Sequence, residues 1–361
     1  MNRRNLFSYI LTMLATALGF FLILAVCNNL YGGQTFEAIF RFLVGAILAG
    51  FFNAAVHELG HYLAGKKNGF AFSSMAIWFF KWKKVKNKTK FEFVLMGEEA
   101  GYTEMIPTNA DNIDKKFLKL TRGGILASFI ITLFGIPPLF MSFLPIWIYS
   151  IWAMFLPVGL YYFLGTCIPT CSGGMLNDGA VISSIKKQTD SSKVMLNLLK
   201  IQAQLYEGKT PKQIDNSLYF DLPQLPEDDI NFAMLLNARY SYYIDNEDYE
   251  NAKKVTARLL SLEDYLPKNY INLIKTDALY NACTFDYNED LADDFLYELE
   301  DYLNNINTAT NLRVKIAYLK NVAKEMEDLD MFFKKAYKEA KREQIKGLGI
   351  YETKLLDGLK D

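Results

Sequence analysis

The chain has 361 residues, of which 51% are hydrophobic, 15% aromatic and 22% charged, a length sufficient for two domains. Its formal net charge of −1 excludes a general electrostatic attraction to nucleic acid, so no nucleic-acid partner is expected. Its four cysteines include no CxxC pair and exclude a disulfide framework. Charged residues are sparse before about residue 65 and dense after residue 186, which indicates a membrane half followed by a soluble half.

Four apolar stretches reach the length of about 20 residues that a helix needs to cross a bilayer. They cover residues 6–30, 36–64, 117–144 and 145–168. The first lies in a charge-free run that is too long for the apolar region of a secretory signal, so we expect a retained span. In the third, Pro137-Pro138 are expected to break or kink the helix.

The distribution of lysine and arginine predicts the orientation of these spans. Basic residues cluster before the first span, between the second and third, and after the fourth, whereas the other two loops have none. Such residues stay on the cytoplasmic side. We therefore expect a multi-pass protein of the cell membrane, with the lipid bilayer as a partner and both termini cytoplasmic. The Lys-, Asn- and Tyr-rich composition fits a bacterium with an AT-rich genome.

The segment between the second and third spans has the composition of β-strands. Residues 70–83 and 90–96 are rich in aromatic and β-branched side chains, and residues 84–89 between them are turn-like. We expect a small membrane-associated β-hairpin over residues 70–96. A short amphipathic segment lying in the membrane interface is the alternative.

From about residue 190 onward the apolar residues have a helical period. The expected helices cover residues 191–207, 228–244, 249–262, 269–284, 290–304, 309–327 and 331–345. The fragment from Tyr242 to Ala252 resembles the junction between the helices of a tetratricopeptide repeat (TPR). We therefore predict a mainly α fold: a transmembrane domain over residues 1–189, followed over residues 190–361 by a soluble, all-α domain of TPR-like helical hairpins.

The two histidines of the chain both lie in one pentapeptide, His57-Glu58-Leu59-Gly60-His61, near the end of the second span. Residues four apart share a face of a helix, so both imidazoles can bind one Zn²⁺ while Glu58 reaches a metal-bound water. We predict His57 and His61 as zinc ligands and Glu58 as the general base. The rarity of the pattern argues against two unrelated histidines on an apolar helix.

A catalytic zinc needs a third protein ligand, and without a third histidine this must be a carboxylate or a cysteine. Asp178, in Asn177-Asp178-Gly179 directly beyond the fourth span, lies by the expected topology at the membrane depth of the histidines. We predict it as the third ligand; a solvated turn aspartate is the alternative. Cys167 and Cys171 are spaced like a ligand or redox pair, but small buried hydrophobes are the commoner case near a span.

Together these motifs resemble the site-2 protease family of intramembrane zinc metalloproteases. Members combine HExxH with a later Asn-x-x-Pro motif and an Asp-Gly motif. Here Thr166-Cys167-Ile168-Pro169 precedes Asn177-Asp178-Gly179, with Thr166 in place of the usual Asn. A Gly-Gly-Pro-x-Ala-Asn-like motif of the family is matched over residues 123–128, where Ile replaces Pro and Ser128 replaces Asn. By this resemblance Ser128 and Asn177 are candidate substrate contacts, and Ser128 is also a candidate oxyanion contact. Close helix packing explains the small residues over 123–128 equally well.

The resemblance covers about residues 36–185 and leaves the helical C-terminal half outside. It implies hydrolysis of membrane-spanning or membrane-associated peptides by a zinc-bound water that Glu58 deprotonates. It also suggests that residues 70–96 accept the unwound substrate as an added strand. The C-terminal helices offer a surface for a protein partner.

Two other functions are compatible with HExxH in a membrane protein. A Ste24/HtpX-like metalloprotease takes its third ligand from a downstream helical glutamate, yet no apolar span after His61 contains a glutamate. A non-catalytic, zinc-stabilised scaffold with a helical docking domain has no need of a base at Glu58, because structural zinc sites are usually closed by four protein ligands.

Overall fold

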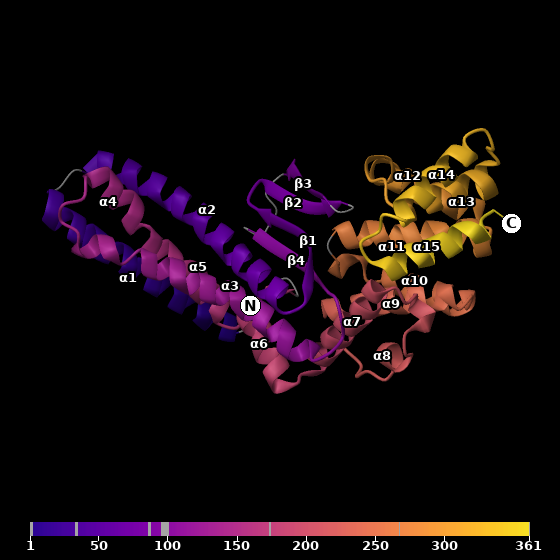
Figure 1. Cartoon of the computed structure of the whole chain (residues 1–361), viewed down its shortest axis with the longest axis horizontal. Helices are drawn as coiled ribbons and strands as arrows, with labels where there is room; N and C mark the ends of the chain where they lie inside the picture. The colour runs from indigo at the N-terminus through magenta and orange to yellow at the C-terminus, as the bar shows by residue number, and fades with distance from the viewer. Residues whose placement is uncertain are drawn as a thin grey trace. The chain divides into compact units, whose positions relative to one another are not determined.

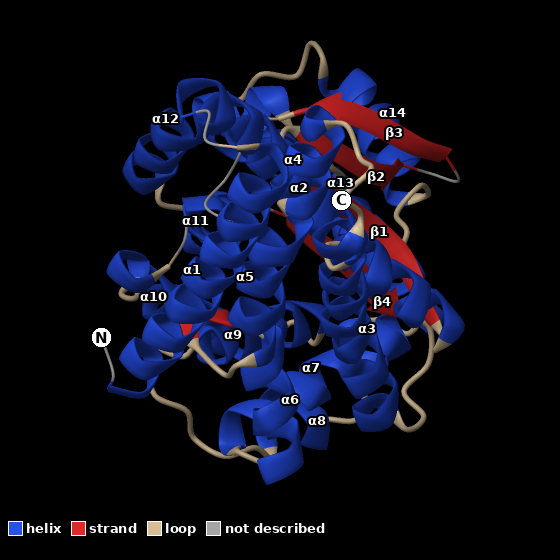
Figure 2. Ribbon diagram, turned by 90° about the vertical axis from the view of Figure 1, so that its left-hand side faces the viewer, coloured by secondary structure: helices blue, strands red, loops and turns tan. Residues whose placement is uncertain are grey.

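The structure is a computed structural model that describes residues 3–32, 35–85, 88–94, 101–172, 175–266 and 268–360. The chain divides into two compact units. Unit 1 comprises Met1–Met105 and Asp114–Thr189, and unit 2 comprises Ile106–Ile113 and Asp190–Asp361. Helices predominate, and the larger of the two sheets contains the strands β1 to β4 (Figure 2).

Unit 1 is built on long apolar helices that run side by side (Figure 1). They are α1 (Arg3–Tyr31), α2 (Thr35–Lys67), α3 (Ile113–Phe134), α4 (Ile146–Ala153) and α5 (Phe155–Cys167). In the described part of the chain, four segments are long and apolar enough to cross a membrane: Asn5–Tyr31, Glu37–Lys67, Ile113–Phe140 and Ile146–Cys167. These segments coincide with the four expected spans.

The third of these segments is less regular than its hydrophobicity predicts. Helix α3 ends at Phe134, and Pro137-Pro138 open a short 3₁₀ helix, η1 (Pro137–Phe140). Proline lacks an amide hydrogen and its ring clashes with the preceding turn, so an α-helix cannot continue through it. The break expected at Pro137-Pro138 is confirmed: α3 ends at Phe134 and the apolar segment continues through η1 to Phe140.

Large apolar side chains on the outer faces of these helices are exposed, among them Phe7, Leu18 and Ile39. A helix that is apolar on all sides is typical of a membrane span. A buried polar group links two of these helices on the inside: the hydroxyl of the fully buried Tyr149 donates to the carbonyl of Ile23 over 3.0 Å and joins α4 to α1.

Between α2 and α3 the chain forms a four-stranded sheet. The strands are β1 (Phe70–Ile77), β2 (Phe80–Val85), β3 (Lys88–Phe93) and β4 (Gly101–Pro107), in the order β3-β2-β1-β4. The pairs β1–β2 and β2–β3 are antiparallel, with Ile77 opposite Phe80 and Trp82 opposite Phe91. The sheet therefore has two edge strands, β3 and β4.

This sheet corrects the expected single hairpin. The expected strand over residues 70–83 turns back at Trp78, whose φ is +53°, so one predicted strand is two. An aromatic pair, Trp78-Phe79, forms this turn without the glycine or asparagine that usually signals one. The expected strand 90–96 is described to residue 94, and residues 95–96 lie outside the described part, as do residues 86–87 of the predicted turn.

Unit 2 is an array of consecutive helices. They are α7 (Asp190–Glu207), α8 (Ser217–Phe220), α9 (Ile230–Asp245), α10 (Tyr249–Leu260), α11 (Lys268–Asn281), α12 (Glu289–Asn305), α13 (Ala309–Tyr318), α14 (Leu329–Ala340) and α15 (Lys346–Gly358). Helices α9, α10, α12 and α13 each follow an Asp, Asn or Thr whose side chain accepts a backbone N–H of the first turn. Sequential pairs pack together, including α9 with α10 and α13 with α14.

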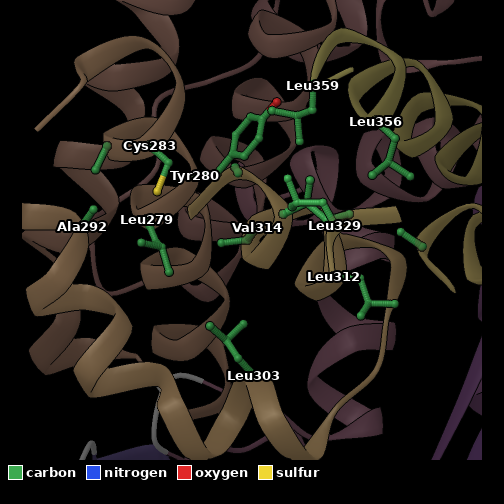
Figure 3. Packing of buried hydrophobic residues seen from close by; sticks show 14 of the residues in the cluster. Leu279, Tyr280, Cys283, Ala292, Leu303, Leu312, Val314, Leu329, Leu356 and Leu359 are labelled. Carbon is green, nitrogen blue, oxygen red and sulfur yellow. The ribbon is translucent and has the colours of Figure 1, made fainter. Parts of the chain in front are cut away.

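One apolar core joins the later helices of unit 2 (Figure 3). It includes Leu279 and Cys283 of the α11 segment, Leu303 of α12 and Val314 of α13. The expected helices are confirmed near their predicted bounds, but α11 and α13 end in π-helical turns at residues 282–286 and 319–323. Helix α15 was not expected; its Leu356 belongs to the same core.

Candidate metal centre

His57 and His61 lie on one face of α2, with their Nε2 atoms 3.0 Å apart. Both side chains are buried. The Nδ1 atom of His61 lies 3.1 Å from the carbonyl oxygen of Leu120 in α3. A carbonyl oxygen only accepts, so Nδ1 of His61 is the donor in this contact and its Nε2 is the nitrogen that faces His57. The Nε2 atoms of both rings therefore face one another on one side of α2, and a neutral imidazole can bind a metal through this atom.

Asp178 completes a triangle of ligand atoms. Its Oδ2 atom lies 3.3 Å from Nε2 of His57 and 3.2 Å from Nε2 of His61. A tetrahedral zinc with bonds of about 2.0–2.2 Å needs ligand atoms about 3.4 Å apart. The three residues form a group that can hold a metal ion, and no other such group is found in the described part of the chain. Their donor set and spacing fit Zn²⁺.

The ionisation of Asp178 suits this role. Burial alone would raise the pKa of its carboxyl, but the neighbouring imidazoles of His57 and His61 hold the pKa at about 2. The carboxyl is therefore a carboxylate at neutral pH, which is the form that binds a cation.

Asp178 is the first residue of helix α6 (Asp178–Lys187), and Asn177 is its N-cap. The Oδ1 atom of Asn177 accepts from the backbone amides of Ala180 and Thr170, over 2.9 and 3.0 Å. Its Nδ2 atom donates to the carbonyls of Gly165 and Ile168, both over 2.7 Å. Asn177 thereby ties the start of α6 to the end of α5 and fixes the position of Asp178.

Glycines let α3 approach the histidines. A Cβ atom at Gly124 would lie 2.3 Å from Nε2 of His61, so a larger residue there would fill the space of the imidazole. Gly60 and Gly123 meet where α2 crosses α3, and a Cβ at either would lie 2.4 Å from the carbonyl oxygen of the other. This contact brings the Leu120 carbonyl to His61, and small residues at such crossings are typical of membrane helices.

Glu58 lies beside the triangle but outside it. Its side chain is buried, and its Oε2 atom accepts a hydrogen bond of 2.6 Å from the hydroxyl of Thr103 in β4. A Cβ atom at Gly101 would lie 3.0 Å from Cγ of Glu58, so β4 runs closely past the carboxylate. Strand β4 therefore holds Glu58 in a fixed rotamer next to the ligand atoms.

A cavity of about 480 Å³ joins these groups. His57, Glu58, His61 and Asp178 line it, together with Asn177, Thr166, Tyr102, Thr103 and Tyr162. Thr166 uses its hydroxyl within its own helix, donating to the carbonyl of Tyr162 over 2.9 Å. The carboxylates of Glu58 and Asp178 and the two imidazoles therefore line the same cavity.

Ser128 lies behind His57 in the structure. Its side chain is fully buried, and its hydroxyl is 2.8 Å from Nδ1 of His57. Ser128 is not among the residues that line the cavity. Cys167 and Cys171 are free thiols and neither belongs to the metal group.

Several residues that support the site were not found from the sequence. Thr103 is an isolated threonine in a strand and carries no motif. The carbonyl of Leu120 is a backbone group, which a sequence pattern cannot select. Close helix packing was expected for the small residues over 123–128, whereas Gly60 on α2 was not singled out as their partner, although a small residue there is the same signal.

The apolar helices and the site define a membrane protein with a metallopeptidase-type centre. The chain belongs to peptidase family M50, the site-2 protease family, whose model matches residues 45–339. This match corrects the expectation that the C-terminal half lies outside the family, because it extends through most of the helical domain. Membership implies an intramembrane metalloprotease. No curated protein and no solved structure matches the chain.

Proposed function

We propose that this protein is a zinc metalloendopeptidase that hydrolyses peptide bonds of membrane-spanning or membrane-associated peptides. The observation that carries the proposal is the triangle of His57, His61 and Asp178 with Glu58 beside it. A structural zinc site would be closed by a fourth protein ligand and would not need a buried carboxylate next to it.

His57, His61 and Asp178 are the residues that would hold the zinc. When bound, zinc supplies a Lewis acid that lowers the pKa of a water ligand to about 7 and polarises a carbonyl group. The ring proton of His61 on the Leu120 carbonyl and the Ser128 hydroxyl at His57 keep both Nε2 atoms directed at the cavity.

Glu58 is the proton carrier in this proposal. Its carboxylate takes the proton of the attacking water and then delivers it to the leaving amine of the cleaved peptide. Thr103 donates to Oε2 of Glu58, which orients the carboxylate and leaves Oε1 for the water. Glu58 is adjacent in sequence to His57, so base and ligands are held by the same helix.

The substrate has to be unwound before its carbonyl can reach these groups, since a helix hides its peptide bonds. We propose that the unwound segment adds to the edge of the sheet. The edge strand next to Glu58 is β4, because Thr103 of β4 bonds that carboxylate. Main-chain hydrogen bonds to an edge strand align a peptide without selecting its sequence. This proposal replaces the expected acceptor, residues 70–96, with the edge strand β4, residues 101–107.

The third ligand also separates the proposal from a Ste24/HtpX-like enzyme. The acid that meets the two histidines is Asp178 at the start of α6, and no helical glutamate joins the metal group within the described residues. The positions of Asp178 and Asn177 after the fourth apolar segment favour the site-2 protease arrangement.

The direct test is cleavage of a transmembrane peptide by the purified, zinc-loaded protein. Glu58→Gln should abolish cleavage, with a loss of at least about 10²–10⁴-fold, because the base is removed while the ligands stay. Asp114→Asn, which removes an acid of unit 1 at the start of α3, serves as the control and should cleave normally. Full activity of Glu58→Gln would overturn the proposal.

A further inference from the structure

A groove of about 760 Å³ lies in unit 2, between α12 and the segment that joins α13 to α14. Its apolar lining includes Leu296 and Tyr297 of α12 and Met326 of the joining segment. Tyr297 is 83% exposed and Met326 65% exposed. These side chains extend an apolar lining that also includes Leu303, Leu319 and Phe332, and an exposed apolar groove with a polar rim is a candidate surface for binding a partner.

The rim of this groove is acidic. Glu300, Glu325 and Glu327 are exposed groove residues, and none of the three forms an ion pair in the described part of the chain. Helix α12 has seven acidic residues and no basic one. The lining contains one basic residue, Lys315, whose ammonium group donates to Asn304 over 2.8 Å, and five acidic ones: Asp293, Glu300, Glu325, Glu327 and Asp328. The groove therefore presents an excess of negative charge above an apolar floor.

This combination selects the chemistry of the occupant. Nucleic acids and anionic lipid surfaces would be repelled by the rim. A free metal cation would leave the apolar floor in contact with water. A polypeptide segment that alternates Lys or Arg with large apolar side chains satisfies both parts, because its apolar residues cover the floor and its cations meet the rim.

Membrane-spanning polypeptides carry such a segment at a defined place. Their cytoplasmic flanks are enriched in Lys and Arg, next to the apolar residues of the span. We propose that the groove binds the basic juxtamembrane segment of the membrane-spanning substrate and so recruits it to the protease. This inference rests on the proposed function and on the expected cytoplasmic position of the C-terminal domain.

The test is binding of a labelled peptide, KLFKKLLKFK, to the full chain in phosphatidylcholine nanodiscs, with empty nanodiscs as the blank. The chain carries Glu58→Gln so that no cleavage interferes. We expect saturable binding that weakens as salt is added, because exposed charges are screened. The acidic counterpart ELFEELLEFE should not bind.

Matched variants locate the binding. Glu300→Lys with Glu327→Lys should weaken binding by about tenfold or more. Asp294→Lys with Asp301→Lys makes the same change of charge at exposed positions of α12 outside the groove and should stay within about twofold of the parent. Tyr297→Ser with Met326→Ser leaves the charge unchanged and should also weaken binding. Unfolding temperatures close to that of the parent establish that the variants fold.

Equal binding by the two charge-reversed pairs, or no effect of the serine pair, would overturn the groove as the binding site. A cleavage assay separates this inference from the proposed function. Loss of the basic flank of a transmembrane substrate should raise KM for the unmutated protein and leave KM unchanged for the Glu300→Lys, Glu327→Lys variant. Peptide binding without any cleavage would contradict the protease proposal alone, whereas cleavage without peptide binding would contradict the groove alone.

Discussion

Each imidazole of the metal centre is held from behind by a different kind of group. Leu120 offers a backbone carbonyl to His61, and Ser128 offers a hydroxyl to His57. Partners of this kind fix the orientation and tautomer of a metal-binding histidine and raise its basicity. The sequence motif selected Ser128 as a contact for substrate, and the structure adds a second candidate role, because the Ser128 hydroxyl lies beside His57.

Ser128→Ala tests the orienting role. We expect zinc affinity to fall by about 10–100-fold, since His57 loses the partner that fixes its ring. Competition with a chelator of known affinity measures this. A substrate contact would behave differently, raising KM while zinc affinity stays unchanged, and that result would contradict the orienting role.

The site residues that could be predicted from the sequence are those that form a recognisable motif or follow an apolar segment. His57, Glu58 and His61 follow from the helical period, and Asp178 from its place after an apolar segment. Thr103 and the Leu120 carbonyl belong to elements distant in sequence, and only the folded chain brings them to Glu58 and His61.

At the scale of elements, the crossing of α2 and α3 determines the geometry of the site. The backbones meet at Gly60 of α2, which directly precedes His61, and at Gly123 of α3, which directly precedes Gly124. Any separation of the helices would move the Leu120 carbonyl away from His61. The sheet is the element least accessible to prediction, because its aromatic turn at Trp78 has the composition of a continuous strand.

Gly60→Ala tests the crossing. The new Cβ would lie 2.4 Å from the carbonyl oxygen of Gly123, so the helices must move apart. Overpacking of this kind costs about 1–3 kcal/mol, and we expect a lower unfolding temperature together with weaker zinc binding. Gly165→Ala is the matched control: nothing lies within 4 Å of its Cβ position, and stability should not fall. Equal stability of the two variants would contradict the close crossing.

At the scale of the whole molecule, composition predicted that apolar spans come first and amphipathic helices follow, because the two kinds of helix differ in their density of charged residues. Orientation in the membrane follows from the positive-inside rule and stays a prediction, as does the TPR-like character of the C-terminal helices. The extent of the family match, to residue 339, could not be predicted from the motifs, since all of them precede residue 180.

Reporter fusions test the orientation. We expect a reporter that is active only in the cytoplasm to be active at both termini, because basic residues lie at each of these positions and in the loop after α2. A fusion in the loop between residues 141 and 145 should be inactive. Opposite activities at the two termini would contradict the four-span topology.

The central claim is that His57, His61 and Asp178 bind zinc and that Glu58 acts on the substrate. Zinc content of purified Glu58→Gln and Asp178→Ala, measured beside the unmutated protein, tests this division most directly. The account predicts one zinc per chain in Glu58→Gln, at a level equal to the unmutated protein, and a large loss of zinc in Asp178→Ala, since a ligand is gone. Full zinc occupancy in Asp178→Ala, or loss of zinc in Glu58→Gln, would contradict it.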